Sequence, residues 1–297
     1  MNQPFVKEKI IFLINPISGT RHKKHLPGII QKLIDAARFD VEILTTKYKG
    51  EATEIVHQKL TEDYTYFVAV GGDGTVNEIA KALINTHGIM GIIPVGSGNG
   101  LARHLKIPMQ PEKAVKLINN LKCQAIDYGL MNNSPFFCTC GVGFDALIGE
   151  KFALGKNRGL MNYVKTTLYE FFNYKPDIYT ITIDNKRTIS REAFLITFAN
   201  GSQYGNNAYI APNADICDGK LDMCILSPFK LYNAPGIGIR LFARNIDKST
   251  SMQIEKATNV LLERASEGVV HFDGEPFHMG KKINISLISK GLNVLIP

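Results

Sequence analysis

Residues 66–84 read YFVAVGGDGTVNEIAKALI, and this stretch decides the fold of the first part of the chain. Residues 66–70 form a short apolar run that favours a buried strand, and residues 76–84 have the spacing of a helix. The turn between them contains GGDGT, whose glycines let the backbone approach a phosphate chain and expose N–H groups to it. The following helix adds its positive N-terminal end. The stretch therefore predicts an anion-binding turn between a strand and a helix.

Asp73 places a carboxylate beside this predicted anion site. Because a carboxylate and a phosphate repel each other, the arrangement makes sense mainly if a divalent cation or a proton transfer lies between them. We therefore expect Asp73 to take part in catalysis. The neighbouring residues that we expect to contact a nucleotide are Gly71, Gly72, Gly74 and Thr75. The alternative is an ordinary strand-to-helix turn in which the Asp is a cap.

The rest of the first part of the chain alternates between strand and helix patterns. Strands are predicted at residues 9–15, 40–46, 66–70 and 90–95, and helices at 26–37, 52–61, 76–84 and 111–120. Apolar strands separated by helices favour a parallel sheet that is covered on both faces. We therefore predict a nucleotide-binding α/β domain with a parallel sheet over residues 1–126.

From about residue 123 the pattern changes to shorter, alternating strands. They are predicted at residues 178–183, 193–198, 221–226, 269–272, 283–288 and 292–296, with helices near 160–172 and 231–244. This pattern is typical of antiparallel sheets. We predict a second, mainly antiparallel domain over residues 127–297, whose C-terminal end could pack back on the first domain.

Two further loops follow predicted strands of the first domain. Residues 15–19 read NPISG, and residues 94–100 read PVGSGNG. Ligands bind beyond the carboxyl ends of parallel strands, so three such loops at one edge indicate a single nucleotide site. The residues expected to line it are Asn15, Pro16, Ser18, Gly19, Gly96, Ser97, Gly98 and Asn99. The chain contains neither a G-x-x-x-x-G-K-[ST] motif nor a dinucleotide fingerprint.

Taken together, the motifs resemble those of the diacylglycerol kinase catalytic-domain family, which also includes sphingosine and ceramide kinases. The similarity extends over nearly the whole chain and keeps the family's order of motifs. It rests on residues 15–19 (NPISG), Thr46 with 50–52 (GEA), 71–80 (GGDGTVNEIA), 94–103 (PVGSGNGLAR), 141–146 (GVGFDA), 218–222 (DGKLD) and 273–276 (DGEP).

The resemblance implies an ATP-dependent kinase that phosphorylates the hydroxyl group of a lipid. It also implies that the domain over residues 127–297 is a sandwich-like lipid-binding domain, which faces the nucleotide domain across a cleft. Thr46 would lie beside the nucleotide. Glu275 is the candidate base for the attacking hydroxyl, because phosphoryl transfer needs a group that accepts its proton. Asp73 would hold or orient the metal or act in catalysis itself. Asp145 would lie near the lipid head group.

The resemblance also implies a Mg²⁺ site formed by the carboxylate of Asp218 and the backbone carbonyls of Asp215 and Lys220. Such a site would support the active-site loop. For each of these carboxylates the alternative is a solvated turn residue, since Asp-Gly pairs are common in turns.

The lipid itself is less clearly indicated by the sequence. Residues 96–99, GSGN, resemble the corresponding loop of sphingosine kinases, whereas many bacterial diacylglycerol kinase relatives carry an Asp directly after the loop Asn. Asp145 could bind the ammonium of an amino alcohol through a charge-assisted hydrogen bond. We therefore expect a sphingoid base slightly ahead of diacylglycerol. The rival functions are an NAD kinase-like small-molecule kinase and a lipid- or nucleotide-binding protein without catalysis.

Composition limits the partners. The net charge of +7 suits an anionic partner, and no nucleic-acid motif is present, so we expect no nucleic acid. No stretch approaches the roughly 18 apolar residues of a spanning helix. We expect a cytoplasmic protein, peripheral at the inner face of the membrane, with a homodimer left open. The candidate membrane contacts are residues 160–172, with Lys156, Arg158 and Lys165 nearby, and residues 231–244.

Overall fold

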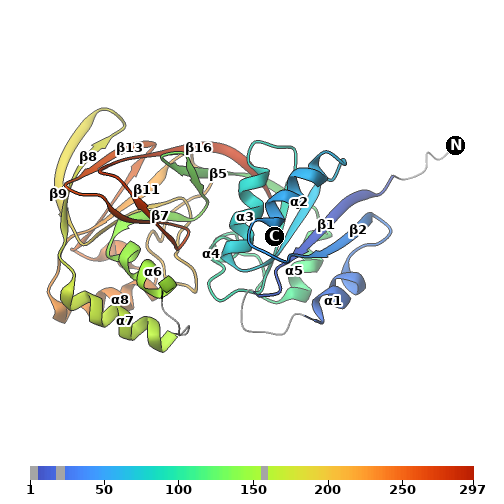
Figure 1. The fold of residues 1–297 in the computed structure, drawn as a ribbon, viewed down its shortest axis with the longest axis horizontal. Coiled ribbons are helices and arrows are strands. Elements are labelled where there is room, and N and C mark those ends of the chain that lie inside the picture. Colours follow the sequence, from blue (N-terminus) through green and yellow to red (C-terminus); the bar gives the residue numbers. More distant parts are fainter. Residues whose placement is uncertain (1–5, 18–23, 155–159) are drawn as a thin grey trace. The chain divides into compact units, whose positions relative to one another are not determined.

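The computed structural model describes residues 6–17, 24–154 and 160–297. The chain divides into two compact units. Unit 1 contains Met1–Ile126 together with Lys290–Pro297, and unit 2 contains Asp127–Ser289. Figure 1 shows the α/β arrangement of unit 1 and the strand-rich arrangement of unit 2. The predicted fold class is confirmed.

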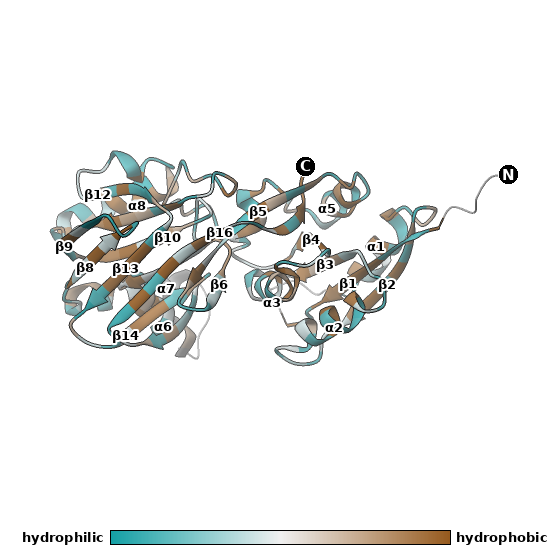
Figure 2. Cartoon of the chain, turned by 90° about the horizontal axis from the view of Figure 1, so that it is seen from above, coloured by the Kyte–Doolittle hydropathy of each residue, from teal (hydrophilic) through white to brown (hydrophobic). Residues whose placement is uncertain are grey.

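Unit 1 is built on a parallel sheet. Its strands lie in the order β2 (Phe39–Thr45), β1 (Glu8–Ile14), β3 (Tyr66–Gly71) and β4 (Ile89–Pro94), and the end of β16 (Lys282–Leu295) continues the sheet beside β4. Helices α2 (Glu51–Leu60) and α3 (Asp73–Leu83) contact each other, as do α1 (Leu26–Leu33) and α5 (Pro111–Ile118). The two pairs cover opposite faces of the sheet (Figure 1), so the central strands are apolar throughout (Figure 2).

Two helices of unit 1 differ from their predictions. The helix expected at residues 26–37 ends at Leu33, because Ile34 turns into an extended conformation and is buried. The Asp35 side chain then accepts a hydrogen bond from the backbone of Ala37, which forms a turn instead of another helical turn. The short helix α4 (Gly100–His104) was not predicted.

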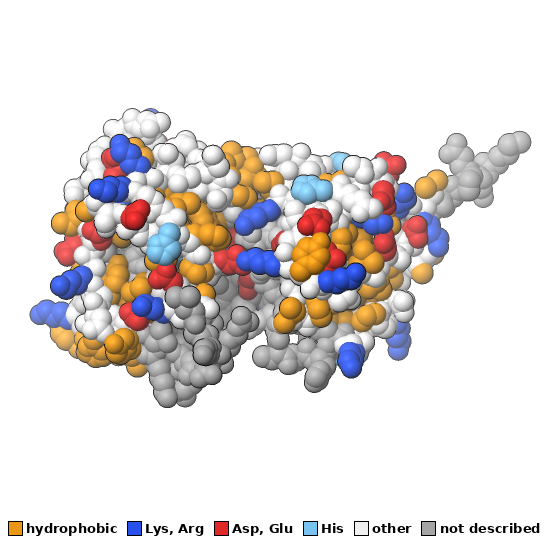
Figure 3. Space-filling model, in the orientation of Figure 1, with side chains coloured by type: hydrophobic (Ala, Val, Ile, Leu, Met, Phe, Trp, Pro, Cys, Tyr) orange, Lys and Arg blue, Asp and Glu red, His pale blue; other side chains and the backbone are white. Residues whose placement is uncertain are grey.

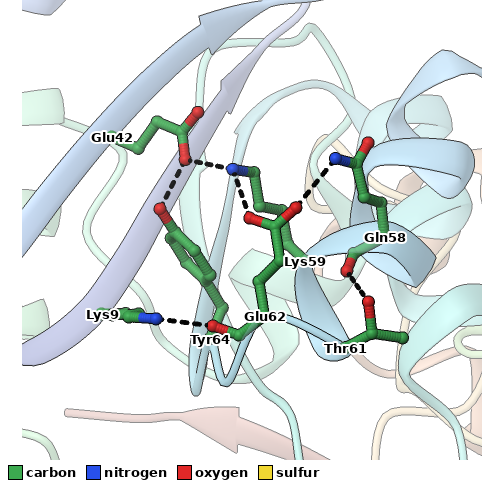
Figure 4. Close-up of polar contacts among 7 residues, drawn as sticks. All are labelled: Lys9, Glu42, Gln58, Lys59, Thr61, Glu62 and Tyr64. Atoms are coloured by element: carbon green, nitrogen blue, oxygen red, sulfur yellow. Dashed lines mark hydrogen bonds and ion pairs between the residues drawn. The ribbon is translucent and has the colours of Figure 1, made fainter.

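A polar network links the edge strand β2 of the unit 1 sheet to helix α2 and to the residues between α2 and β3 (Figure 4). Lys59 of α2 forms ion pairs of 2.9 Å with both Glu42 of β2 and Glu62, and the Tyr64 hydroxyl donates to Glu42 at 2.6 Å. Burial, with the bond to Glu42, raises the pKa of Tyr64 to about 12. The phenol therefore stays protonated at neutral pH and remains a donor to Glu42.

Unit 2 contains two antiparallel sheets. One has the order β16, β13 (Asn259–Arg264), β8 (Asp177–Ile183) and β9 (Arg187–Ala193). The other has the order β12 (Met252–Ala257), β11 (Leu221–Leu226), β10 (Leu195–Ala199), β7 (Thr139–Gly143), β14 (Gly268–Phe272) and β15 (Glu275–Met279). Alternate side chains of both sheets, such as Phe198 and Leu262, form one buried core between them. Strands β5 (Cys123–Met131) and β6 (Ser134–Phe136) add a short hairpin.

Three helices lie on the outer face of the second sheet. They are α6 (Phe144–Leu154), α7 (Leu160–Asn173) and α8 (Ala234–Phe242), the last of which follows the 3₁₀ turn η1 (Leu231–Asn233). Rings from α6, α7 and the sheet stack closely, with Phe144 and Phe194 centred 4.5 Å apart and Phe171 and Phe229 5.4 Å apart. This aromatic layer buries the outer face of the sheet. Helix α6 was not predicted.

Arg264 fastens the open end of the β14–β15 hairpin. Its guanidinium donates hydrogen bonds to the carbonyls of Gly268 (2.7 Å), Val269 (3.2 Å), Met279 (2.7 Å) and Gly280 (3.3 Å). The residue is only 9% exposed, and this burial lowers the pKa of Arg264. The fork of donors suits several carbonyls at once.

Replacing this side chain tests its role in the fold. We expect Arg264→Met to lower the free energy of unfolding by about 2–4 kcal/mol, since four backbone carbonyls lose the buried guanidinium that donates to them. Arg187→Met, which removes an exposed ion pair with Glu255, should cost about 0–1 kcal/mol. Chemical denaturation followed by circular dichroism measures both. Equal costs for the two variants would refute the role assigned to Arg264.

Candidate active site

The predicted nucleotide loops of unit 1 lie together at the carboxyl edge of its sheet. Ile14 pairs with Thr45 on one side and with Val70 on the other, and Gly71 pairs with Pro94. The residues that follow these strands therefore start at one level of the sheet. They include Asn15, Pro16, Thr46, Gly72, Gly74, Thr75, Gly96, Ser97, Gly98 and Asn99. Ser18 and Gly19 lie outside the described residues.

Asp73 joins the two glycine loops. Its Oδ2 accepts a hydrogen bond from the Asn99 N–H at 2.8 Å, and its Oδ1 accepts one from the Gly100 N–H at 2.6 Å. The carboxylate therefore caps α4, which begins at Gly100, rather than its own helix α3. Asp73 is therefore a cap that fixes the second loop against the first. Its role in catalysis stays a prediction.

Glycines make the close approach of the two loops sterically feasible. A Cβ atom on Gly96 would lie 2.4 Å from the Gly72 Cα, and one on Gly98 would lie 2.6 Å from the Asp73 Oδ2. Neither distance is tolerated between atoms that are not bonded. A side chain at Gly96 or Gly98 would therefore push the loops apart.

Two further contacts fix the same edge. The Asn15 side-chain amide donates to the Thr75 hydroxyl at 3.1 Å and so links the first loop to α3. Glu78 of α3 accepts hydrogen bonds from the N–H groups of Ala52 and Thr53, at 2.9 and 3.4 Å, and caps α2. Sequence reasoning did not assign Glu78. Its place in the helix after the glycine turn, facing the GEA segment, is the signal that was available.

In unit 2, Glu275 is the first residue of β15, directly after a tight turn. Asp273 and Gly274 have φ values of 47° and 84°, the left-handed conformation that two-residue hairpin turns require. The Asp273 carboxylate accepts three backbone hydrogen bonds of 2.7–3.0 Å, from Phe137, Cys138 and Thr139. The half-buried Glu275 thus follows a turn that the hydrogen bonds of Asp273 hold in place.

Asp145 of α6 is the centre of a polar cluster inside unit 2. Its Oδ2 accepts hydrogen bonds from the Thr197 hydroxyl (2.8 Å) and the Tyr204 hydroxyl (2.9 Å) and lies 3.0 Å from the His271 Nε2. Burial, with the charge of Asp145 beside it, raises the pKa of Tyr204 well above its usual value. The phenol is therefore a permanent donor to the carboxylate. His271 was not singled out from the sequence.

Helix α6 is tied to the β14–β15 hairpin by two carboxylate–imidazole contacts. The first is Asp145 with the buried His271 of β14, and the second is Glu150 with the exposed His278 of β15, at 2.7 Å. Arg264 holds the open end of the same hairpin, and Asp273 holds its turn. The strand that begins with Glu275 is consequently fixed at both ends and along one side.

The three predicted metal ligands lie in the turn before β11. The Asp218 carboxylate forms an ion pair with Lys256 and accepts a hydrogen bond from the Lys220 N–H, and the buried Asp127 accepts one from the Gly219 N–H. Burial raises the pKa of Asp222, and the carboxylates of Asp218 and Asp215 raise it further.

This turn was tested as a site for Mg²⁺. Its donors are oxygens, which Mg²⁺ prefers, and the buried Asp222 Oδ2 has no hydrogen-bond partner among the described residues. Within the same described part of the chain, no three His, Cys, Asp or Glu side chains converge on one point. A cation bound at this turn would compete with Lys256 for Asp218. Asp215, Asp218 and Lys220 remain predicted ligands.

Known proteins resemble both units. The diacylglycerol kinase catalytic domain matches residues 9–131, and the YegS C-terminal NAD kinase beta sandwich-like domain matches residues 139–294. A probable lipid kinase YegS-like from Pseudomonas aeruginosa is 30% identical over 98% of this chain and 95% of its own length. A diacylglycerol kinase from Bacillus subtilis is 29% identical over 91% of this chain and 89% of its own.

The fold agrees with these similarities. The crystal structure of a putative diacylglycerol kinase from Bacillus anthracis superimposes with a TM-score of 0.78 at 25% identity, over 98% of this chain and 97% of that one. The motifs that suggested the resemblance, in both units, fall within the matched residues. The chain therefore belongs to the family of lipid kinases that carry the diacylglycerol kinase catalytic domain and the YegS-type C-terminal domain.

Proposed function

We propose that this protein transfers the γ-phosphate of ATP to the hydroxyl group of a membrane lipid. The observation that carries the proposal is the double hydrogen bond from Asp73 to the start of α4, which joins two glycine loops at the carboxyl edge of the unit 1 sheet. Backbone N–H groups in such loops suit a phosphate chain. The lipid-kinase family of the chain supplies the class of acceptor.

In this reaction the lipid oxygen forms a bond to the γ-phosphorus, and the bond from that phosphorus to the β,γ-bridging oxygen breaks to release ADP. The hydroxyl proton passes to the Glu275 carboxylate, which is the candidate base. Asp73 would keep the second loop in place and orient the charges around the phosphates. Mg²⁺, when bound, supplies positive charge that neutralises the phosphate oxygens. Asp218 would hold a Mg²⁺ ion that supports the active-site loop.

The cluster around Asp145 bears on the identity of the lipid. A carboxylate that awaits an ammonium group should retain free acceptor capacity on the side of the substrate. Here the Oδ2 already has contacts to Thr197, Tyr204 and His271, and the Oδ1 accepts the Ala146 N–H at 2.8 Å. The Oδ2 is therefore occupied by its neighbours, so diacylglycerol, a neutral alcohol that needs no ion pair, is the second candidate beside the sphingoid base.

Asp73 is tested by two substitutions. Asp73→Ala removes both hydrogen bonds to α4 and should abolish turnover and weaken ATP binding. Asp73→Asn keeps one acceptor of the same size but loses the charge and one of the two hydrogen bonds to α4, because an amide NH₂ cannot accept from a backbone N–H. We expect at least a roughly 10²-fold fall in kcat. Asp40→Asn, an exposed carboxylate of β2, is the matched control. Near wild-type kcat in Asp73→Asn would show that the charge of Asp73 is not used in catalysis.

Glu275→Gln preserves size and one acceptor oxygen, but it replaces the other oxygen by an NH₂ donor and cannot accept the proton. We expect it to fold normally, bind ATP as the wild type does and lose roughly 10²–10⁴-fold in kcat. Glu267→Gln, at the exposed loop before β14, should leave kcat unchanged. Isothermal titration with a non-hydrolysable ATP analogue and steady-state kinetics measure the two properties. If ATP affinity fell while catalysis remained intact, the role assigned to Glu275 would be reversed.

The acceptor lipid is tested by assays with sphinganine and dioleoylglycerol in identical mixed micelles. The GSGN loop predicts faster turnover of sphinganine. Faster turnover of dioleoylglycerol would contradict this interpretation of the loop. Asp145→Asn separates the explanations: a sphingoid-base enzyme should lose affinity for sphinganine selectively, as a rise in KM. A loss of thermal stability with unchanged KM for both lipids would leave Asp145 only a structural role.

A further inference from the structure

The outer side of α7, η1 and α8 exposes a group of large hydrophobic side chains, called here the apolar surface. Its members are Leu168, Tyr169, Phe172, Leu231, Tyr232, Ile239 and Phe242, each between 44% and 73% exposed. Only five other large hydrophobic side chains are exposed in the part of the chain that the structure describes. Such concentration in one region marks an interaction surface rather than chance exposure.

The apolar surface is continuous with the fold beneath it. Phe171 on α7 and Ile237 on α8 pack into the hydrophobic layer below, whereas the exposed residues of these helices face solvent. The ring of Phe171 lies 5.4 Å from that of Phe229, which places α7 beside the segment leading into η1 and α8. Figure 3 shows hydrophobic side chains gathered at the lower left, where α7 and α8 lie in Figure 1.

Positive charge accompanies the apolar surface. Residues 227–246 contain no Asp or Glu but include Lys230, Arg240 and Arg244. The ammonium of the exposed Lys230 lies 5.9 Å from the centre of the Tyr232 ring. On α7 the single acidic residue, Glu170, is 14% exposed and paired with Lys151 at 3.8 Å. Lys156 and Arg158, also expected here, lie outside the described residues, and the side chain of Lys165 is not described.

We propose that the apolar surface docks on an anionic lipid bilayer, with the basic residues at the lipid head groups. No helix among the described residues is long and apolar enough to cross a bilayer, so contact with a membrane would be made from its surface. Helices that lie in an interface bury one apolar side and place Lys and Arg near anionic head groups. The inference rests on the proposed function, because a lipid kinase must reach a substrate held in a membrane.

Sedimentation with vesicles tests the surface without any turnover. The wild type should bind vesicles of phosphatidylcholine with one-third phosphatidylglycerol far more strongly than vesicles of phosphatidylcholine alone. The variant Tyr169→Ser/Phe172→Ser/Phe242→Ser should bind the anionic vesicles at least about tenfold more weakly. Lys175→Gln/Lys230→Gln, which removes the exposed lysine that follows α7 and the one that precedes η1, should reduce binding and its salt dependence. Ile178→Ser, which removes an exposed side chain of β8, is the control and should bind as the wild type.

Several outcomes would overturn the inference. Equal wild-type binding to neutral and anionic vesicles would do so, as would unchanged binding by the triple variant. So would a shift from dimer to monomer in the triple variant with vesicle binding intact, since the surface would then be a contact between two copies.

Turnover separates this inference from the proposed function. The triple variant should phosphorylate a short-chain, water-soluble lipid at the wild-type rate but a long-chain lipid in vesicles more slowly. If the wild type phosphorylates no lipid, yet the triple variant loses vesicle binding, the proposed function fails and the docking surface stands.

Discussion

The capping of α4 by Asp73 is the interaction on which the nucleotide side of this protein depends. One carboxylate accepts the N–H groups of two successive residues, Asn99 and Gly100, from a loop that follows a different strand. Gly72 and Gly96 allow the backbones to meet, because any side chain at Gly96 would clash with its neighbour. The cap therefore turns two separate loops into one rigid edge, which is what a phosphate chain needs in order to meet several N–H groups at once.

In unit 2, a hairpin holds the candidate base in place. Glu275 lies next to a turn, and a turn is ordinarily the most mobile part of a hairpin. Here Asp273 fastens the turn, Arg264 fastens the open end, and the contacts with His271 and His278 hold one side against α6. The backbone that carries the candidate base therefore loses little conformational entropy when a substrate binds. Such positioning favours proton transfer.

Much of this architecture could be predicted from the sequence. The buried run that became β1 and the glycine turn after β3 follow from local pattern alone, and the family followed from motifs that are each local. Helix α6 could not be predicted in this way, because its own apolar residues are spread around the helix and do not form a single apolar face. Helix α1 ends at Leu33, before its predicted end, because Ile34 leaves the helix and is buried. This burial depends on tertiary packing, which local sequence does not show.

The contacts of the site were beyond the reach of local patterns. The hydrogen bond between Asp73 and Asn99 joins residues 26 apart in the sequence, and the contact between Asp145 and His271 joins residues 126 apart. A single sequence carries no signal for such pairs, so His271 and Glu78 were missed and the neighbours of Asp145 could not be assigned. The roles predicted for the site residues stay predictions, and their hydrogen-bond partners depended on the fold.

The central claim, phosphorylation of a lipid hydroxyl with ATP, is tested most directly by following the label of [γ-³²P]ATP. The purified protein is incubated with Mg²⁺ and, in separate reactions, with long-chain lipids of several classes or with NAD, and each reaction is extracted with chloroform. The account predicts that label enters the chloroform phase with at least one hydroxyl lipid and disappears when Mg²⁺ is chelated. Label transferred only to NAD, or ATP bound with no product from any lipid, would contradict it.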